Sequence, residues 1–313
     1  MRVVVTGAAG FIGSHLVPAL VAGGHDVLAV DAVHRATTPR AAMANRAELA
    51  RAGITVTECD LLTDDLGPLG DADAVLHLAG RPGVRSSWGP GEADTHRANV
   101  VATGRLLAAC AGSRPRFVLA SSSSVYGSAA HPSAECDRLE PRSPYAASKA
   151  EAERLAQRAA AEGTPVVILR YFSVYGPRQR PDMAFHRFIE AALDGSPAPL
   201  YGDGAQSRSF TFVSDVVDAT VRAARVPLPA GTVLNVGHPV TVGLHDALER
   251  IGVQLGVPPP TVPKDAAPGD VARTWAAAER TAALLGWTAT TGLDEGLARQ
   301  IEWHRGRRGG SRG

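Results

Sequence analysis

The stretch RVVVTGAAGFIGSHLVPALVA, residues 2–22, joins a short β-branched run to a glycine-rich turn and then to a helical pattern. The run Arg2–Thr6 predicts a buried strand, and the apolar residues after the turn recur at helical spacing. Gly7, Gly10 and Gly13 lie between the two elements. Glycines in such a turn let the backbone approach a diphosphate, to which the helix N-terminus offers unpaired N–H groups. The stretch therefore predicts the strand–turn–helix unit of a dinucleotide site.

Short apolar runs continue to alternate with helical patterns beyond this unit, which favours βαβ units and a parallel sheet. Runs such as VVIL have no polar alternation, as is typical of strands covered on both faces. We predict an α/β fold with a Rossmann-like doubly wound parallel sheet. Further strands are expected at 27–30, 54–56, 74–78, 117–120, 166–169 and 233–236, and helices at 11–22, 105–111, 146–161 and 216–224.

From about residue 171, segments rich in glycine, proline and arginine loosen the pattern. We expect them to form a smaller C-terminal substrate-binding lobe over the carboxyl edge of the sheet, where doubly wound folds bind ligands. The expected division is a nucleotide domain at 1–170 with a return at about 209–237, a lobe at 171–208 and 238–304, and a flexible basic tail at 305–313. Helices of the lobe are expected at 184–193, Leu244–Leu255 and 293–304.

Composition narrows the function classes. The chain has 313 residues, of which 32 are basic and 31 acidic, so it lacks the charge excess of a nucleic-acid-binding protein. Cys59, Cys110 and Cys136 are odd in number and far apart, which fits neither a disulfide framework nor a zinc site. No apolar run has the length of a membrane span, and residues 1–13 do not resemble a signal peptide. We therefore expect a cytoplasmic protein without a metal, a membrane partner or a nucleic-acid partner.

Only two lysines occur among the 32 basic residues, Lys149 and Lys264. Tyr145 and Lys149 form YAASK at the start of an expected helix, and the four-residue step puts both side chains on one face. A tyrosine with an ordinary pKa of about 10 needs that pKa lowered to act as a base near neutrality. A compact ammonium can lower it, whereas a planar guanidinium suits this task less well. The serines at 121–124 end a strand and are expected at the same edge of the sheet.

Acidic residues follow two other strands. Asp31 is expected to accept hydrogen bonds from an adenosine ribose and to repel a 2′-phosphate, which favours NAD over NADP. His34 and Arg35 lie close enough in sequence to weaken this preference. Asp60 and Leu61 follow the third strand, where the carboxylate either meets the adenine amino group or belongs to a plain turn.

Seven motifs follow one another along the chain: TGAAGFIGSH, LHLAG, SSSSVYG, YAASK, LRYFSVYGPRQRPDM, GAQSRSFTFVSDV and NVG. Together they resemble the extended short-chain dehydrogenase/reductase family of NAD-dependent nucleotide-sugar epimerases and dehydratases. The resemblance implies bound NAD, a UDP-linked sugar in the lobe, Tyr145 as the base, Lys149 as its tuner and Ser122 as a hydroxyl that binds the reacting sugar oxygen. The cofactor contacts it implies are Gly7, Gly10, Phe11, Ile12, Gly13, Asp31, Asp60, Leu61, Leu78, Ala79, Gly80, Asn99, Tyr145 and Lys149.

Within this family, GVRSSW (83–88) and SVYGPRQRPDM (173–183) resemble UDP-glucuronate 4-epimerases. A uronate carboxylate needs cationic or hydroxyl partners, and arginine can bind it through two N–H groups. Arg85 and Arg180 are of the right type, although loop packing or diphosphate binding would explain them equally well. The expected substrate contacts are Arg85, Ser122, Ser123, Ser124, Tyr145, Ser173, Arg180 and Arg208.

Arg208 matches the family arginine that contacts the nucleotide diphosphate and ribose. The family commonly has a second arginine in the late loop, where this chain has Ala267, and Lys264 is a candidate to replace it in part. The chain therefore lacks one cation that family members use to bind the diphosphate, and we expect this to affect the affinity for the nucleotide or its identity.

The resemblance thus implies epimerisation of UDP-glucuronate to UDP-galacturonate through a transient 4-keto sugar, with Tyr145 taking the 4-hydroxyl proton while C4 hydride passes to NAD⁺. A UDP-glucose/UDP-galactose 4-epimerase is the alternative, ahead of a 4-ketoreductase, a decarboxylase or a dehydratase. Ser123 and Ser124 replace the Asp-Glu pair of dehydratases. A non-catalytic NAD-binding regulator is the alternative from another class. Family members also suggest a homodimer through the helices beside YAASK.

Overall fold

The computed structural model describes residues 1–309. Its centre is a seven-stranded sheet with the order β11-β6-β5-β4-β1-β2-β3, in which every neighbouring pair is parallel. The strand order reverses beside β1, which opens a crevice at the carboxyl edge. The prediction of a Rossmann-like doubly wound sheet is confirmed. The strands are β1 (Arg2–Thr6), β2 (Asp26–Asp31), β3 (Val56–Glu58), β4 (Ala74–His77), β5 (Arg116–Ser122), β6 (Val166–Tyr171) and β11 (Thr232–Val236).

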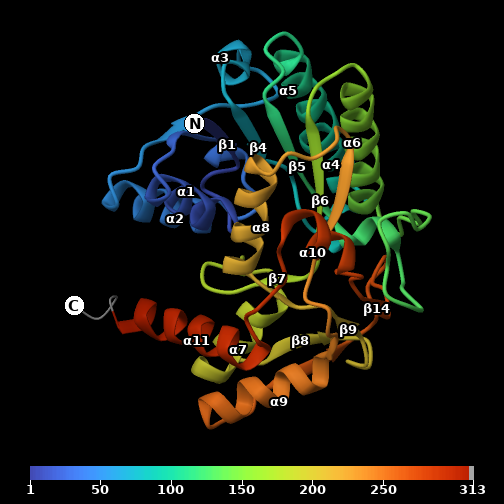
Figure 1. The fold of residues 1–313 in the computed structure, drawn as a ribbon. Coiled ribbons are helices and arrows are strands. Elements are labelled where there is room, and N and C mark those ends of the chain that lie inside the picture. The colour runs from blue at the N-terminus through green and yellow to red at the C-terminus, as the bar shows by residue number, and fades with distance from the viewer. Residues whose placement is uncertain (310–313) are drawn as a thin grey trace.

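Helices cover both faces of this sheet (Figure 1). Val3 and Val5 of β1 pack in a cluster with Leu16, whereas Val4 packs in a second cluster with Leu106. Both faces are therefore buried, which explains the uninterrupted apolar runs in the strands. The helices on the first face are α1 (Gly13–Ala22), α2 (Pro39–Arg51) and α8 (Val213–Arg225), and those on the second are α3 (Gly67–Gly70), α4 (Gly91–His96), α5 (Ala102–Cys110) and α6 (Pro144–Ala161).

Several element ends differ from the expected ones. The first helix begins at Gly13, because residues 11 and 12 belong to the turn. Helix α6 begins at Pro144, where the Ser143 hydroxyl caps it by accepting a hydrogen bond from the Ala146 N–H at 3.1 Å. A π-helical segment, η3 (Arg97–Val101), joins α4 to α5, so the helix expected at 105–111 is the end of a longer helical segment. Three short 3₁₀ segments are η1 (Val33–Arg35), η2 (Arg85–Ser87) and η4 (Ser123–Tyr126).

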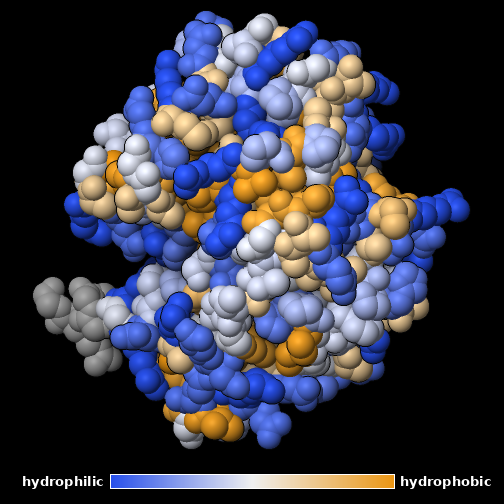
Figure 2. Space-filling view, viewed as in Figure 1, coloured by the Kyte–Doolittle hydropathy of each residue, from blue (hydrophilic) through white to orange (hydrophobic). Residues whose placement is uncertain are grey.

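The C-terminal lobe lies below the sheet in Figure 1 and is built from short strands and four helices. Helix α11 includes the first five residues of the segment that we expected to be a flexible tail, and residues 310–313 lie outside the described part. Figure 2 shows apolar side chains gathered in the middle of one face, where sheet and lobe meet. The elements are β7 (Val174–Tyr175), α7 (Ala184–Asp194), β8 (Ala198–Tyr201), β9 (Ser207–Arg208), β10 (Thr211–Phe212), β12 (Val242–Gly243), α9 (Leu244–Leu255), β13 (Thr261–Lys264), β14 (Arg273–Thr274), α10 (Glu279–Leu285) and α11 (Leu293–Gly309).

No helix within residues 1–309 combines the length and the apolar character needed to cross a membrane.

A buried ion pair fastens α6 to the sheet. Arg170 on β6 donates to the Glu153 carboxylate from both Nε and Nη2, at 3.0 and 2.7 Å, and both side chains are almost fully enclosed. Ser121 also donates to Glu153, and Arg170 donates to the Tyr126 hydroxyl at 2.7 Å. Tyr126 in turn donates to Asn235 on β11 at 2.7 Å. The network therefore connects α6 with the three strands β5, β6 and β11.

We expect Glu153→Gln to lower the free energy of unfolding by about 3–5 kcal/mol, because it leaves the Arg170 charge buried without its partner. Urea unfolding measures this change. The matched control is Asp218→Asn, which removes the exposed pair between Asp218 and Arg222 on α8 and should change stability by about 0.5 kcal/mol or less. Equal effects of the two substitutions would contradict the assigned role of the buried pair.

Candidate active site

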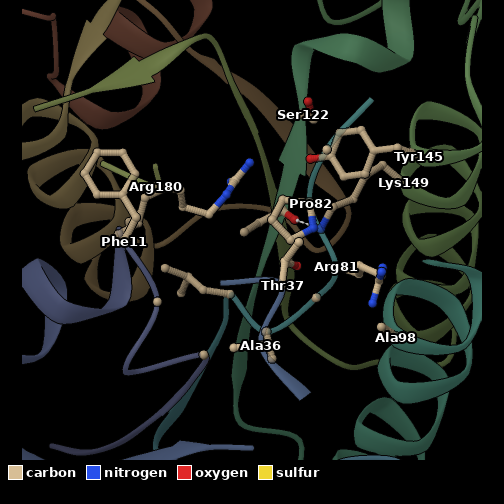
Figure 3. Close-up of a pocket in the computed structure, with 18 of the residues that line it drawn as sticks. Phe11, Ala36, Thr37, Arg81, Pro82, Ala98, Ser122, Tyr145, Lys149 and Arg180 are labelled. Carbon is tan, nitrogen blue, oxygen red and sulfur yellow. Dashed lines mark hydrogen bonds between the residues drawn. The ribbon is translucent and has the colours of Figure 1, made fainter. Parts of the chain in front are cut away.

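A cavity of about 900 Å³ opens at the carboxyl ends of the strands, between the sheet and the lobe. Its walls come from β1, β2, β5 and β6, from the loop after β4, and from the lobe segments around residues 173–183 and 269–274. Figure 3 shows Ser122, Tyr145 and Lys149 together on one side of the cavity, with Phe11 and Arg180 reaching in from the other side. The cavity thus brings together residues from both parts of the chain.

The glycine turn at the start of α1 is closed to larger residues. Gly7 has a φ of +72°, and a Cβ on Gly13 would lie 2.1 Å from the Gly7 carbonyl oxygen. Gly10 packs against the same oxygen, with its ideal Cβ 3.0 Å away. Phe11 and Ile12 line the cavity beside this turn. At the first turn of α1 no side chain blocks the backbone N–H groups, which can therefore bind a diphosphate. The residues present fit a dinucleotide.

Asp31 ends β2 next to this turn, and its carboxylate accepts a hydrogen bond from the Ala9 N–H at 2.9 Å. Burial raises the pKa of Asp31, and the backbone N–H groups oppose that effect. The neighbouring cations already have partners. Arg35 pairs with Asp60, and His34 lies 2.8 Å from the Glu58 carboxylate. Both side chains are therefore engaged locally rather than left for a 2′-phosphate.

Asp60 begins the turn after β3, and its side chain stabilises that turn. Its Oδ1 accepts a hydrogen bond from the Leu62 N–H at 2.9 Å, and its other oxygen pairs with Arg35. Burial acts to raise the pKa of Asp60, but the Leu62 N–H and Arg35 outweigh it and the net pKa is lowered. Asp60 and Leu61 both line the cavity. The Asp60 carboxylate thus accepts hydrogen bonds within the turn after β3 and also lines the cavity.

The segment after β4 is held by Asn99. The Asn99 Oδ1 accepts from the Arg81 N–H at 2.7 Å, while its Nδ2 donates to the Ser148 hydroxyl at 2.9 Å. A Cβ on Gly80 would lie 2.6 Å from that Oδ1 and 3.6 Å from the Lys149 Nζ. Asn99 therefore ties the β4 loop to α6. The loop residues Leu78, Ala79 and Gly80 line the cavity, and Gly80 lies next to the Lys149 ammonium.

Lys149 is buried, and its Nζ donates to the Ala120 carbonyl at 2.8 Å. Burial lowers the pKa of Lys149 to about 8, while the charge of Glu153, one helical turn further along α6, acts to raise it. Glu153 is thus part of both the buried network and the electrostatics of the site.

Tyr145 lies at the start of α6, where its hydroxyl is hydrogen-bonded to Ser122. Burial raises the pKa of Tyr145, and the Ser122 bond and the Arg180 charge act to lower it. The cation that lowers the Tyr145 pKa in this structure is therefore Arg180, a residue of the lobe. The backbone N–H of Tyr145 donates to the Ser87 hydroxyl at 3.1 Å, which fixes the first turn of α6.

The serines at the end of β5 and the start of η4 have different partners. Ser121 donates to Glu153, whereas Ser122 accepts hydrogen bonds from both the N–H and the hydroxyl of Ser124, at 3.2 and 3.0 Å. Ser122, Ser123 and Ser124 all line the cavity. Of these three serines, Ser122 is the one that acts on the Tyr145 hydroxyl.

The expected substrate arginines fall into two places. Arg180 forms a two-point pair with Asp182, at 3.0 and 2.9 Å, and its charge acts on Tyr145. Arg85 instead pairs with Asp270 at 2.7 Å and lies 3.8 Å from the centre of the Tyr201 ring. Arg208 is close to this second pair, because the charges of Asp270 and Arg85 both act on it. Ser173, with a φ of +24°, lines the cavity with Arg180.

The structure does not place Lys264 at the cavity. Lys264 ends the exposed strand β13, and residues 264–267 are outside the cavity wall, which resumes at Gly269 and Asp270. Sequence reasoning missed Asp182, Asp270 and Ser87, whose partners lie up to 185 residues away along the chain. Ser87 and Asp182 had a sequence signal, because they stand within the GVRSSW and SVYGPRQRPDM motifs.

We expect Gly13→Ala to weaken dinucleotide binding and to lower stability by about 1–3 kcal/mol, because the new methyl group overlaps the Gly7 carbonyl. Titration with NAD⁺ and thermal unfolding measure the two effects. Gly112→Ala is the matched control, since a Cβ there would meet no atom within 4 Å. Unchanged NAD⁺ affinity in Gly13→Ala would refute the assigned role of the turn.

Comparison with known proteins agrees with this geometry. The "Uncharacterized UDP-glucose epimerase YtcB" of Bacillus subtilis (strain 168) is 38% identical, with 97% of this chain and 98% of that protein covered. The crystal structure of UDP-glucuronic acid 4-epimerase from Bacillus cereus, in complex with UDP-glucuronic acid and NAD, matches with a TM-score of 0.94 and 36% identity, covering 98% and 100% of the two chains. MoeE5 in complex with UDP-glucuronic acid and NAD matches with a TM-score of 0.89 and 44% identity, covering 98% and 100%.

The family model for NAD-dependent epimerases and dehydratases matches residues 3–237, which include the glycine turn, Asp31, the serines at 121–124 and the Tyr145–Lys149 pair. The chain belongs to the NAD-dependent epimerase/dehydratase family.

Proposed function

We propose that this protein is an NAD-dependent UDP-sugar 4-epimerase whose substrate is UDP-glucuronate and whose product is UDP-galacturonate. The observation that carries the proposal is the grouping of Ser122, Tyr145 and Lys149 in one cavity with the Arg180 guanidinium facing them. The match to the Bacillus cereus UDP-glucuronic acid 4-epimerase supports the choice of sugar.

The glycine turn and Asp31 would hold NAD. The backbone around Gly7 and Gly13 leaves room for the diphosphate, and the Asp31 carboxylate, already oriented by Ala9, has lone pairs left for ribose hydroxyls. When bound, NAD supplies a reversible hydride acceptor for the sugar C4. The expected cofactor residues Leu78, Ala79 and Gly80 line the same cavity as Lys149.

Tyr145 is the proposed base for the sugar 4-hydroxyl, and Ser122 positions both hydroxyls. Ser122 and the charge of Arg180 both act to lower the Tyr145 pKa, against the larger effect of burial, which raises it. Lys149 uses one N–H on the Ala120 carbonyl, so its ammonium retains two donors for a ribose hydroxyl and contributes positive charge. The proton thus moves between the sugar oxygen and a hydroxyl held at a fixed position.

Arg180 and Ser173 form the proposed carboxylate subsite. The Arg180 Nε and Nη2 bind Asp182, and the Nη1 donors remain for a substrate carboxylate. A 4-keto uronate is a β-keto acid that readily loses CO₂, so a fixed carboxylate orientation protects the intermediate. We assign Arg85 and Arg208, which share Asp270, to the nucleotide side of the cavity.

UDP-glucose is the second candidate substrate, because MoeE5 has also been solved with UDP-glucose and NAD. A homodimer through α6 and a cytoplasmic location remain proposals that rest on the sequence and its family resemblance.

Incubation with UDP-glucuronate should give UDP-galacturonate without net consumption of NAD⁺, as separation of the products will show. Tyr145→Phe should lower the rate about 10²- to 10⁴-fold by removing the base, while NAD⁺ affinity stays close to that of the wild type. Interconversion of UDP-glucose and UDP-galactose without UDP-galacturonate would overturn the uronate assignment and keep the epimerase. Stoichiometric oxidation of NADH by a keto sugar would instead identify a reductase.

Arg180→Gln should lower kcat/KM for UDP-glucuronate about 10- to 100-fold, the value of a lost hydrogen bond to a charged group. Activity on UDP-glucose, which has no carboxylate, should fall less, because it loses only the effect of the Arg180 charge on the Tyr145 pKa. Arg85→Gln is the comparison variant and should affect both substrates alike, because Arg85 lies with Asp270 rather than with Tyr145. Equal losses on both substrates in Arg180→Gln would reject the carboxylate subsite.

A further inference from the structure

Three consecutive residues of the lobe segment after β7 reach three different parts of the molecule. Arg180 lines the active-site cavity (Figure 3). Gln179 is buried in the lobe, and the Arg178 side chain extends to helix α1 beside the sheet. The segment 176–183, which carries the proposed carboxylate subsite, is therefore fastened both to the lobe and to the nucleotide domain.

Gln179 fastens the segment within the lobe. Its Oε1 accepts hydrogen bonds from the His186 N–H at 3.0 Å and from the Gln300 Nε2 at 2.9 Å. Its own Nε2 donates to the Val174 carbonyl at 3.2 Å. Gln300 on α11 also accepts a hydrogen bond from the Gly176 N–H at 3.1 Å. Helices α7 and α11 thus hold the lobe side of the segment.

His15 and Arg178 fasten the segment to the first turn of α1. The Arg178 Nη1 donates to the Ser14 carbonyl at 3.0 Å, and its Nη2 donates to the His15 Nδ1 at 3.1 Å. The His15 Nε2 lies 2.8 Å from the Pro177 carbonyl oxygen, which can only accept, so this nitrogen carries the proton. One neutral tautomer of His15 therefore satisfies both contacts. We call Ser14, His15, Pro177 and Arg178 the α1 latch.

His15 serves the α1 latch as a neutral ring, because a protonated Nδ1 could not accept a hydrogen bond from Arg178. Burial and the Arg178 charge lower the pKa of His15 to about 4, so the ring is neutral at physiological pH. His15 lies outside the cavity wall. Any effect of His15 on a bound sugar therefore passes through the segment that it holds.

The backbone of Arg178 depends on these contacts. Its φ is +64°, a left-handed conformation that is uncommon for residues other than glycine. Besides its bonds to Ser14 and His15, the guanidinium has the Glu48 carboxylate 3.5 Å away. Such a conformation persists where the surrounding contacts fix it. Loss of the α1 latch should therefore let residues 176–183 rearrange.

We propose that His15 and Arg178 are positioning residues that hold Arg180 in place for the carboxylate of the sugar. This inference rests on the proposed epimerisation of UDP-glucuronate. Arg180 is two residues from Arg178, and its guanidinium binds Asp182 within the same segment, at 3.0 and 2.9 Å. The α1 latch therefore sets where this pair stands relative to the glycine turn, from which α1 begins. The preference for a uronate over a neutral sugar thus depends on His15, a residue that does not touch the sugar.

Hydrogen exchange of the full-length protein tests the α1 latch itself. The N–H groups of Gly176, Gln179 and Met183 are hydrogen-bonded and report on the segment. His15→Leu removes both bonds of the ring, and residues 176–183 should exchange about three- to tenfold faster, the value of a lost hydrogen bond. His15→Gln retains a donor and an acceptor, so its exchange should stay closer to that of the wild type.

The control variant is His131→Leu, which removes an exposed histidine and should leave the exchange of residues 176–183 unchanged. The core strand β4 should keep its wild-type exchange rate in His15→Leu. Unchanged exchange of residues 176–183 in His15→Leu would overturn the proposal. An equal increase in β4 would also overturn it, because the substitution would then only lower overall stability.

Calorimetric titration tests the effect on the sugar. We would use NAD-bound Tyr145→Phe protein, in which conversion of the sugar is slow. There His15→Leu should weaken the binding of UDP-glucuronate about three- to tenfold relative to that of UDP-glucose. When Arg180→Gln is also present, His15→Leu should not change this ratio further, because both substitutions disable the same subsite. An unchanged ratio in His15→Leu, or additive changes in the combined variant, would overturn the positioning role.

Failure of this proposal can be told apart from failure of the proposed function. If Arg180→Gln alone leaves the ratio of affinities unchanged, the carboxylate subsite is wrong, and the positioning of Arg180 for a carboxylate falls with it. The exchange of residues 176–183 then still decides whether the α1 latch holds the segment. If Arg180→Gln changes the ratio and His15→Leu does not, the proposed function stands and the positioning role of His15 is wrong.

Discussion

The carboxylate of Glu153 is surrounded by three groups that need its charge. Arg170 binds it from β6, and Ser121 donates to it from β5. Its charge also opposes the lowering of the Lys149 pKa by burial, one turn earlier on α6. A buried arginine and a buried lysine on either side of one anion are tolerable only while that anion stays ionised. The packing of α6 on the sheet and the charge of the proposed catalytic lysine thus depend on one interaction.

The lobe completes the electrostatics of the site. Strand β5 supplies Ser122 and helix α6 supplies Tyr145 and Lys149. Burial there raises the pKa of Tyr145 and lowers that of Lys149, which opposes the chemistry. Arg180 comes from the lobe, is held by Asp182, and acts in the opposite direction on Tyr145. Closure of the lobe over the sheet is therefore part of what would make the tyrosine a base.

Much of the sheet was predictable, because strands covered on both faces give uninterrupted apolar runs. Arg2–Thr6 was predicted to the residue. The third strand was placed two residues early, since Thr57 and Glu58 are exposed at the sheet edge and carry no apolar signal. The site residues of the glycine turn and YAASK come from local motifs. The partners Asp182, Asp270 and Ser87 could not be predicted as a set, because long-range folding brings Asp270 to Arg85 and Ser87 to α6.

The position of β11 in the chain has a consequence for synthesis. Six strands of the sheet are complete by Tyr171, but β11, which pairs with β6, ends only at Val236, after the first lobe segments. During translation, β6 therefore presents an apolar strand with an open edge while about sixty more residues are made, at roughly 5–20 residues per second. Exposed edges of this kind pair readily with other chains. The nascent protein passes through a period of several seconds in which association with a chaperone or premature aggregation is decided at this edge.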